Sequence, residues 1–178
     1  PSGAMKRACL LSMWMENNRV NRRDDIVIAL AGNPNCGKTS LYNYITGSRQ
    51  HVGNYPGVTV ERKEGTVPVD DAVVTFVDLP GTYSLSPFSI EEYVARHEIL
   101  SSTVQAVIVV VDTTRLERNL YFASQIIETG KPVVLALNMF DEFEASGNEL
   151  EIGQLSAILG VPCIPTIGNR GKGVLELM

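Results

Sequence analysis

The sequence lacks features that would place it among membrane-spanning or nucleic-acid-binding proteins. No apolar run approaches the roughly 18–20 residues that a membrane-spanning helix requires, and the longest, Ala106 to Val111, predicts a buried strand. Basic residues are in the minority, with 15 Lys and Arg against 20 Asp and Glu and a net charge of −5. Because nucleic-acid phosphates select basic surfaces, we expect no nucleic-acid partner.

Cysteine is also scarce. The three cysteines, Cys9, Cys36 and Cys163, are widely spaced and odd in number, which is typical of a protein in a reducing cytosol and not of a disulfide framework. The two histidines add no metal-ligand spacing, so we expect no zinc or iron–sulfur site built from protein side chains.

The length of 178 residues, with 44% hydrophobic and 20% charged residues, indicates one soluble globular domain. Residues 1–25 show no clear period and are predicted to be a flexible lead-in, in which Pro1 to Met5 are interpreted as vector-derived. Lys6 to Met15 faintly resembles a signal peptide, but its apolar part is short and no cleavage site of small residues follows. The folded domain is therefore assigned to residues 26–178.

The most informative stretch begins at Gly32. An apolar strand candidate, Ile26 to Ala31, precedes it, and Ser40 to Ile45 has the pattern of a helix. A strand, a glycine-bounded loop, Lys-Thr and a helix form the context of a phosphate-binding loop, whose backbone N–H groups and helix dipole face a polyphosphate. The residues expected to contact a nucleotide here are Gly32, Asn33, Pro34, Asn35, Cys36, Gly37, Lys38, Thr39 and Ser40.

Two side chains of this loop have specific chemistry. Lys38 would supply a mobile cation for the β- and γ-phosphates, and the hydroxyl of Thr39 can ligate Mg2+. The alternative interpretation is a glycine-rich turn that carries a surface lysine. The strand and the helix on either side favour the phosphate-binding loop.

From Ile26 onward, predicted strands alternate with predicted helices, the pattern of an α/β sheet with helices on both faces. Strands at Glu61–Val69 and Val73–Asp78 are joined only by Asp70-Asp71, so they must pair antiparallel. We expect a mixed, mostly parallel sheet of about six strands, with a loop at Gly47–Val58. Further strands are predicted at 106–112, 133–138 and 162–166, and helices at 89–100, 117–129 and 152–159, with a polar stretch before the last helix. The helix at 89–100 is expected to begin with a capping box formed by Ser89 and Glu92.

A second group of candidate residues follows the strand that ends at Asp78. Its carboxylate can hold Mg2+ through water, and the N–H of Gly81 can meet a γ-phosphate. Thr59, in the loop after the first helix, is placed to close over the same Mg2+, with Gly57 and Val58 beside it. Each of these alone is typical of an ordinary loop residue, but their order after a phosphate-binding loop favours a nucleotide switch.

A third group, Asn138-Met139-Phe140-Asp141, follows another strand. The Asp141 carboxylate would accept hydrogen bonds from N1–H and the N2 amino group of guanine, each worth roughly 1.5–3 kcal/mol, whereas the unprotonated N1 of adenine would be repelled. Asn138 would tie this loop to the phosphate loop, and Met139 would pack on the base where a lysine is usual. The alternative is an Asn/Asp pair that only caps a helix.

A fourth group lies near the C-terminus. Ile167, Gly168 and Asn169 stand where a loop closes over guanine O6 with backbone N–H groups. Gly168 occupies a position where alanine is more usual. This motif depends on the other three for its interpretation.

Five stretches together resemble the N-terminal G domain of bacterial ferrous-iron transporter B (FeoB): residues 32–39, 52–61, 78–87, 116–121 and 138–141. The likeness covers roughly Ile26 to the C-terminus. It implies a Ras-like P-loop GTPase fold that binds GTP or GDP with Mg2+.

The resemblance also implies partners and a location. Members of the family carry helical and transmembrane domains that move Fe2+, with the G domain at the cytoplasmic face of the bacterial inner membrane. Neither domain follows Met178, so we expect an isolated, soluble G domain, for which self-association is a further partner to consider.

The resemblance further implies how GTP would be hydrolysed. Thr82 occupies a position where many G proteins have a glutamine that orients water, so we expect slow intrinsic hydrolysis. FeoB-like proteins use an asparagine at the position of Asn35 to hold K+ beside the phosphates, with carbonyls of 52–57 completing the shell. Alternatively, Asn35 only shapes the loop. Cys36, where serine is commoner, is either a small packing residue or a redox-sensitive site.

Two other functions stay open at this point. A soluble GTPase of ribosome assembly or tRNA modification would share the phosphate loop but should bring a basic RNA-binding appendage, which this acidic chain lacks. A GTP-dependent regulatory module with negligible turnover is favoured by the missing glutamine. Use of ATP is disfavoured by Asp141.

Overall fold

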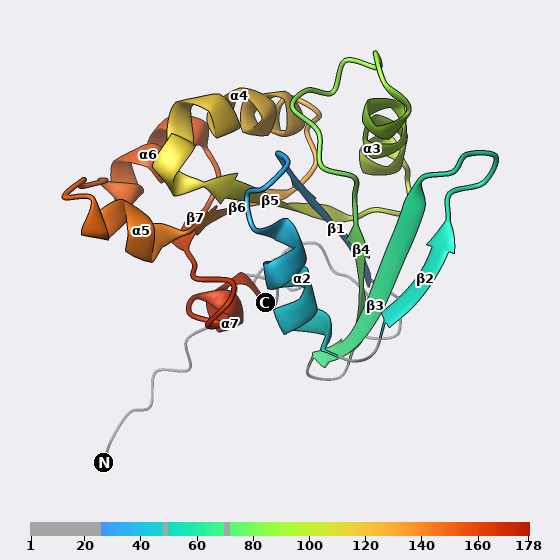
Figure 1. The fold of residues 1–178 in the computed structure, drawn as a ribbon, viewed down its shortest axis with the longest axis horizontal. Helices are drawn as coiled ribbons and strands as arrows, with labels where there is room; N and C mark the ends of the chain where they lie inside the picture. The colour runs from blue at the N-terminus through green and yellow to red at the C-terminus, as the bar shows by residue number, and fades with distance from the viewer. Residues whose placement is uncertain (1–25, 48–49, 70–71) are drawn as a thin grey trace.

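A computed structural model describes residues 26–47, 50–69 and 72–178. The strands are β1 (Ile26–Gly32), β2 (Gln50–Asn54), β3 (Glu61–Val69), β4 (Ala72–Asp78), β5 (Ala106–Asp112), β6 (Val133–Asn138) and β7 (Cys163–Pro165). The helices are α2 (Lys38–Thr46), α3 (Ile90–Leu100), α4 (Leu116–Ile127), α5 (Phe140–Ala145), α6 (Ile152–Leu159) and α7 (Val174–Leu177), with a 3-10 turn, η1 (Thr113–Arg115) (Figure 1). The predicted lead-in and the Asp70-Asp71 turn lie outside the described residues.

The strands form one sheet in the order β2-β3-β4-β1-β5-β6-β7. Neighbours from β4 to β7 run parallel, whereas β3 pairs antiparallel with both β2 and β4. The predicted mixed, mostly parallel sheet is therefore confirmed. The central strands β1 and β5 are apolar along nearly their whole length because both of their faces are covered.

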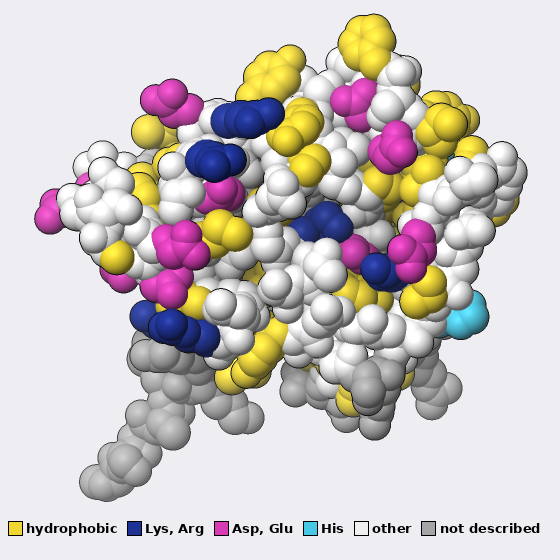
Figure 2. Space-filling view, viewed as in Figure 1, with side chains coloured by type: hydrophobic (Ala, Val, Ile, Leu, Met, Phe, Trp, Pro, Cys, Tyr) yellow, Lys and Arg dark blue, Asp and Glu magenta, His cyan; other side chains and the backbone are white. Residues whose placement is uncertain are grey.

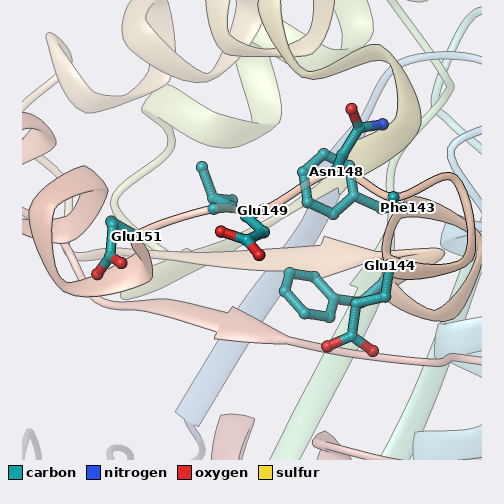
Figure 3. Close-up of a pocket in the computed structure, with 8 residues that line it drawn as sticks. Phe143, Glu144, Asn148, Glu149 and Glu151 are labelled. Atoms are coloured by element: carbon teal, nitrogen blue, oxygen red, sulfur yellow. The ribbon is translucent and has the colours of Figure 1, made fainter.

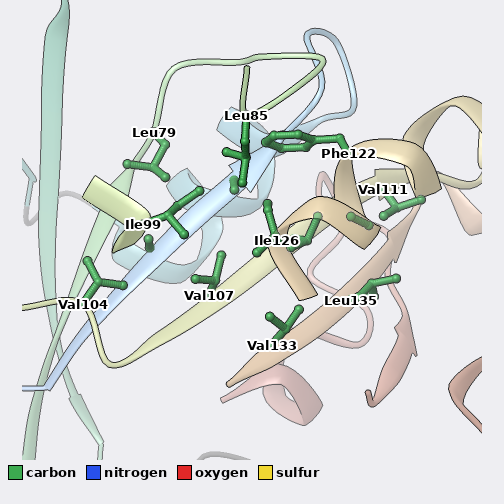
Figure 4. Close-up of a cluster of buried hydrophobic side chains, with 14 of the residues drawn as sticks. Leu79, Leu85, Ile99, Val104, Val107, Val111, Phe122, Ile126, Val133 and Leu135 are labelled. Carbon is green, nitrogen blue, oxygen red and sulfur yellow. The ribbon is translucent and has the colours of Figure 1, made fainter. Parts of the chain in front are cut away.

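Two hydrophobic clusters lie on opposite faces of the sheet. On one face, Leu41 and Tyr42 of α2 and Val174 of α7 pack against alternate residues of the central strands. On the other face, Phe122 and Ile126 of α4 lie over the sheet together with Ile99 of α3 (Figure 4). Partly buried residues of α6 pack against the same cluster. Helices therefore cover both faces, as the sequence pattern predicted.

The prediction of a loop over Gly47–Val58 is wrong for part of this segment. Gln50–Asn54 forms β2, which pairs antiparallel with β3 and makes seven strands instead of about six. The strand has no apolar alternation and is mostly exposed, so it is recognised by its backbone pairing with β3 and not by its sequence. Sequence periodicity cannot detect such an edge strand.

The predicted polar stretch before α6 contains a short helix, α5. Met139 precedes it in a left-handed conformation with φ 58°, and the rings of Phe140 and Phe143 pack with centroids 5.7 Å apart. Six residues are too few to show a clear helical period. The helix begins at Phe140, so Asp141 lies in its first turn.

The capping box predicted at the start of α3 is confirmed. The Ser89 hydroxyl accepts a hydrogen bond from the Glu92 N–H at 3.1 Å, and the Glu92 carboxylate accepts one from the Ser89 N–H at 3.1 Å. Other predicted boundaries differ by a few residues: the last strand is Cys163–Pro165 and α4 is Leu116–Ile127. No helix within the described ranges is both long enough and apolar enough to span a bilayer.

Candidate nucleotide-binding site

The predicted phosphate loop connects the carboxyl end of β1 to the first residue of α2, Lys38. Gly37 has φ 82°, and a Cβ there would lie 2.2 Å from Nδ2 of Asn138, so both the torsion and the space require glycine. Asn35 is also left-handed, with φ 66°, a conformation that asparagine tolerates. The first turn of α2 has no acidic residue, so the positive end of its dipole is not neutralised locally.

A groove of about 480 Å³ runs along this loop. Figure 2 shows a hollow near the middle of the face, close to where β1 leads into α2 in Figure 1, with a basic side chain beside acidic ones. The residues that line the groove are Asn33, Pro34, Asn35, Gly37, Lys38, Thr39, Ser40 and Gly81. The groove therefore combines backbone N–H groups, a lysine and hydroxyls, which is the chemistry that a phosphate requires.

The lysine of the loop forms an ion pair with the carboxylate of Asp78, the last residue of β4. Lys38 Nζ donates to Asp78 Oδ1, and the two side chains are only 10% and 8% exposed. Burial leaves few other partners for either charge. The structure thus places the predicted phosphate-binding cation beside the predicted Mg2+ carboxylate.

The segment after Asp78 packs directly on the phosphate loop. The Thr82 N–H donates to the Gly32 carbonyl at 3.3 Å. A Cβ on Gly81 would lie 3.2 Å from Cα of Pro34, so glycine permits this close approach of two backbones. Gly81 consequently lines the groove together with the phosphate loop.

Asn138 joins the phosphate loop to two other loops. Its Nδ2 donates to the Cys36 carbonyl at 2.9 Å, and its Oδ1 accepts from the Gly168 N–H at 2.9 Å. The predicted link from Asn138 to the phosphate loop is therefore present. Sequence reasoning missed the Thr113 hydroxyl, which donates to the Asn138 carbonyl at 2.8 Å, although its position just after a strand was a usable signal.

A smaller pocket, of about 80 Å³, continues from the groove and shares Gly37 and Ser40 with it. Its lining includes the residues predicted to hold the base: Asn138, Met139, Asp141, Ile167, Gly168 and Asn169. Arg170, which the sequence analysis did not select, lies with Nη1 3.7 Å from Oδ2 of Asp141. The pocket thus presents a half-buried carboxylate with a guanidinium beside it.

The Cys36 thiol is a buried packing group. Its side chain is 1% exposed, and burial raises its pKa from 9.0 to about 11, only partly opposed by hydrogen bonding and by the charge of Lys38. A buried thiol that stays protonated is a poor nucleophile. The redox-sensitive alternative for Cys36 therefore has no support in the geometry.

Within the described part of the chain, unpaired buried polar atoms occur on Asn33, which lines the groove, and on Thr82, which follows the groove residue Gly81. Both side-chain polar atoms of Asn33 and the Thr82 hydroxyl have no hydrogen-bond partner among the described residues. Buried polar groups are normally paired, so these atoms fit a polar ligand with bound water. The unpaired amide of Asn33, a residue that lines the groove, agrees with a polar ligand at this place.

The predicted switch residues 57–59 do not line either pocket of the described chain. They lie between β2 and β3, at the tip of the antiparallel ribbon in Figure 1, and Thr59 is exposed. Residues 52–54, expected to offer carbonyls to K+, belong to β2. The predicted roles of these residues stay predictions, and they require this loop to approach the groove.

A separate pocket of about 450 Å³ lies on the far side of α5 from the base loop. Figure 3 shows the carboxylates of Glu144, Glu149 and Glu151 around it. Three carboxylates would repel the phosphates of a nucleotide. The nucleotide chemistry therefore belongs to the groove at Lys38.

Comparison with known proteins agrees with this geometry. A family model described as Ferrous iron transport protein B matches residues 26–178. The chain is 54% identical over 153 residues to an Fe(2+) transport protein A/Fe(2+) transporter FeoB fusion protein of Porphyromonas gingivalis, covering 85% of this chain and 18% of that protein. It is 53% identical over 156 residues to the Fe(2+) transporter FeoB of Escherichia coli K12, covering 85% of this chain and 20% of that protein.

A solved structure is similar as well. The GDP-bound crystal structure of a mutant S. thermophilus NFeoB matches with a TM-score of 0.80 and 51% identity, covering 85% of this chain and 59% of that chain. The Ras-like G-domain fold expected from the sequence is thereby confirmed. The chain spans about a fifth of the length of the two curated relatives. On the strength of the family match and these identities, the chain belongs to the ferrous iron transport protein B family.

Proposed function

We propose that the chain binds guanine nucleotides with Mg2+ and hydrolyses GTP to GDP and phosphate, as the G domain of a ferrous-iron transporter. The observation that carries this proposal is the role of Asn138, whose amide joins the Cys36 carbonyl to the Gly168 N–H. The phosphate groove and the pocket at Asp141 also share Gly37 and Ser40 in their linings, which supports one nucleotide spanning both. GDP in the similar NFeoB structure supports the same assignment.

The phosphates would lie against the start of α2, where Lys38 offers a charge and the backbone offers N–H donors. Thr39 and Asp78 would hold Mg2+, with Thr59 added when its loop approaches. The ion would neutralise charge on the phosphates. Gly81 would direct its N–H at the γ-phosphate from the rim of the groove.

Hydrolysis would be slow and assisted by K+. Thr82 is only 3% exposed and too short to orient water as a glutamine does. Asn35 is exposed in the groove, next to the expected phosphate position, and its side chain would hold K+ there. The cation would take the place of an arginine finger.

The larger context follows from the relatives. The helical and transmembrane parts of the longer relatives would be the partners of this domain, and Fe2+ would be their cargo. The site would then lie at the cytoplasmic face of the bacterial inner membrane, where nucleotide state would switch or energise transport. A second copy of the G domain is a further partner to test.

Steady-state hydrolysis of GTP and of ATP, each in KCl and in NaCl at matched ionic strength, tests the proposal. We expect GTP turnover that K+ raises, and no turnover of ATP. Loss of the K+ effect in N35A, with GTP affinity retained, would support the role of Asn35. Absence of GTP turnover in both salts would refute the proposed GTPase activity. The remaining function would be that of a regulatory GTP-binding module.

The base assignment predicts that D141N loses GTP affinity. The carboxylate would accept two charge-assisted bonds of roughly 1.5–3 kcal/mol each, so affinity should fall by about two to four decades. Titration with a fluorescent GTP analogue measures this. E144Q, which changes an exposed carboxylate on the same helix outside this pocket, should bind GTP within about threefold of the parent. An equal loss in both variants would contradict a specific role of Asp141.

A further inference from the structure

Outside the nucleotide pockets, one side-chain contact ties the segment after Gly81 to α4. The guanidinium carbon of Arg118 lies 4.4 Å from the centroid of the Tyr83 ring. Tyr83 follows Thr82 in the loop between β4 and α3, whereas Arg118 is on the exposed surface of α4. The geometry is that of a cation–π contact between two elements that are 35 positions apart in the sequence.

This contact is the outer part of a longer set of restraints on the same segment. On the inner side, Thr82 N–H donates to the Gly32 carbonyl at 3.3 Å, and Gly81 packs on Pro34. On the outer side, the Leu85 N–H donates to Oε1 of Gln125 on α4 at 2.7 Å. Residues 81–85 are thus held between the phosphate loop and α4.

The position of this segment matters because Thr82 has little reach. A side chain that is short and buried cannot adjust to place water or a phosphate, so the placement must come from the backbone of Gly81 and Thr82. Backbone placement in turn depends on what holds the neighbouring residues. Tyr83 is the first residue of the segment whose side chain leaves the core, and it is 44% exposed.

We propose that Arg118 is a positioning residue for GTP hydrolysis: by holding the Tyr83 ring against α4, it fixes the Gly81–Thr82 backbone at the phosphate groove. The inference rests on the proposed GTPase function. Arg118 does not touch either nucleotide pocket of the described chain, so its effect should fall on turnover and not on binding.

The size of the effect follows from the exposure of the contact. Cation–π pairs at exposed sites contribute a small stabilisation free energy. If the transition state for GTP hydrolysis loses this stabilisation, the rate falls by about two- to fivefold. We therefore expect R118A and Y83L each to lower kcat for GTP by about two- to fivefold, with KM and GDP affinity within about twofold of the parent.

Matched variants separate positioning from general destabilisation. R118K keeps a cation and Y83F keeps a ring, so both should retain most of the parental kcat. R115A is the control, because Arg115 is exposed on the turn before α4 and its side chain makes no ion pair or ring contact within the described residues. The double variant R118A/Y83L should be no slower than the slower single variant, because each change removes the same interaction between the guanidinium and the ring.

A second readout does not depend on hydrolysis. Amide hydrogen exchange at Thr82 and Leu85 should speed up in R118A and stay parental in R115A, because these N–H groups bond to Gly32 and Gln125.

The outcomes for the two proposals are distinct. A parent chain that hydrolyses GTP, with R118A equal to R115A in kcat and in exchange, overturns the role of Arg118 and leaves the proposed function intact. A rise of kcat in R118A, or a loss confined to GDP affinity, also overturns it. A parent chain without GTP turnover refutes the proposed function itself.

Discussion

At the scale of single residues, the Asn138 side chain links separate loops of the candidate site through several hydrogen bonds. It is 3% exposed, and its amide satisfies the Cys36 carbonyl on one side and the Gly168 N–H on the other. The Thr166 hydroxyl adds a longer bond of 3.4 Å to the same oxygen. A buried group that loses its partner costs more free energy than the bond itself contributes.

N138A should therefore lower the free energy of unfolding by about 2–4 kcal/mol, because two buried backbone groups lose their partners at once. Urea denaturation measures this change. T166V removes only the longer bond and keeps the side-chain volume, so it should cost less than about 1 kcal/mol. Equal destabilisation by the two variants would contradict a connecting role for Asn138.

The Cys36 thiol gives a prediction about pH. Its pKa rises to about 11 by burial, so the folded protein holds this proton where the unfolded chain, with a pKa of 9.0, has lost it. The contribution of this thiol to stability is thus complete below pH 9 and decreases between about pH 9 and 11.

Alkylation by iodoacetamide, followed by mass spectrometry, should modify Cys36 slowly in the folded protein at pH 8, with the rate still rising above pH 10. In urea, the rate should level off near pH 9, the pKa of the unfolded thiol. Fast modification of the folded protein at neutral pH would show an exposed thiolate and contradict the burial argument.

At the scale of elements, the C-terminal end of α3 depends on a lysine from another part of the chain. Lys131, in the loop before β6, donates from Nζ to the carbonyls of Ser101 at 2.7 Å and Val104 at 2.6 Å. A cation that satisfies carbonyls beyond the last turn also complements the helix dipole. Lys131 thereby connects α3 to the loop that enters β6.

K131M should lower the free energy of unfolding by about 1.5–3 kcal/mol, because hydrogen bonds from a charged donor to two carbonyls are lost. Guanidinium denaturation measures this effect, and GDP affinity should stay parental because the lysine is remote from both nucleotide pockets. K63M is the control, because the ion pair that Lys63 makes with Glu61, at 3.6 Å, is half-exposed and its loss should cost less than about 1 kcal/mol.

At the scale of the whole molecule, the candidate site collects loops from the carboxyl ends of parallel strands. The phosphate loop follows β1, the Asp78–Gly81 segment follows β4, and the two base loops follow β6 and β7. Open α/β sheets bind their ligands at this edge. A nucleotide would contact loops from both sides of the central strand, so its binding free energy would add to the stability of the whole sheet.

GDP at 100 times its dissociation constant should raise the free energy of unfolding by about 2.7 kcal/mol, by mass action. Urea denaturation with and without GDP measures this. ATP at the same concentration should give no stabilisation, and D141N should lose most of the GDP effect. Equal stabilisation by ATP and GDP would contradict the guanine assignment.

The sequence by itself determined the features that depend on local pattern. The strand–loop–helix order around residues 32–39, the buried strands and the capping box at Ser89 follow from spacing and apolar runs, because each involves neighbours along the chain. The same holds for the α/β fold class. Family-specific stretches then pointed to the FeoB resemblance that the comparisons confirmed.

Only the tertiary structure decided the features that depend on partners far away in the chain. Strand β2 exists because β3 pairs with it, and Asn138 connects to Cys36 across 102 positions. Likewise, Arg118 lies over Tyr83 and Arg170 lies beside Asp141. The spacing of residues along the sequence does not predict either contact. The physical reason is that backbone pairing and side-chain contacts between separate loops are fixed by packing of the whole sheet, which a local pattern does not encode.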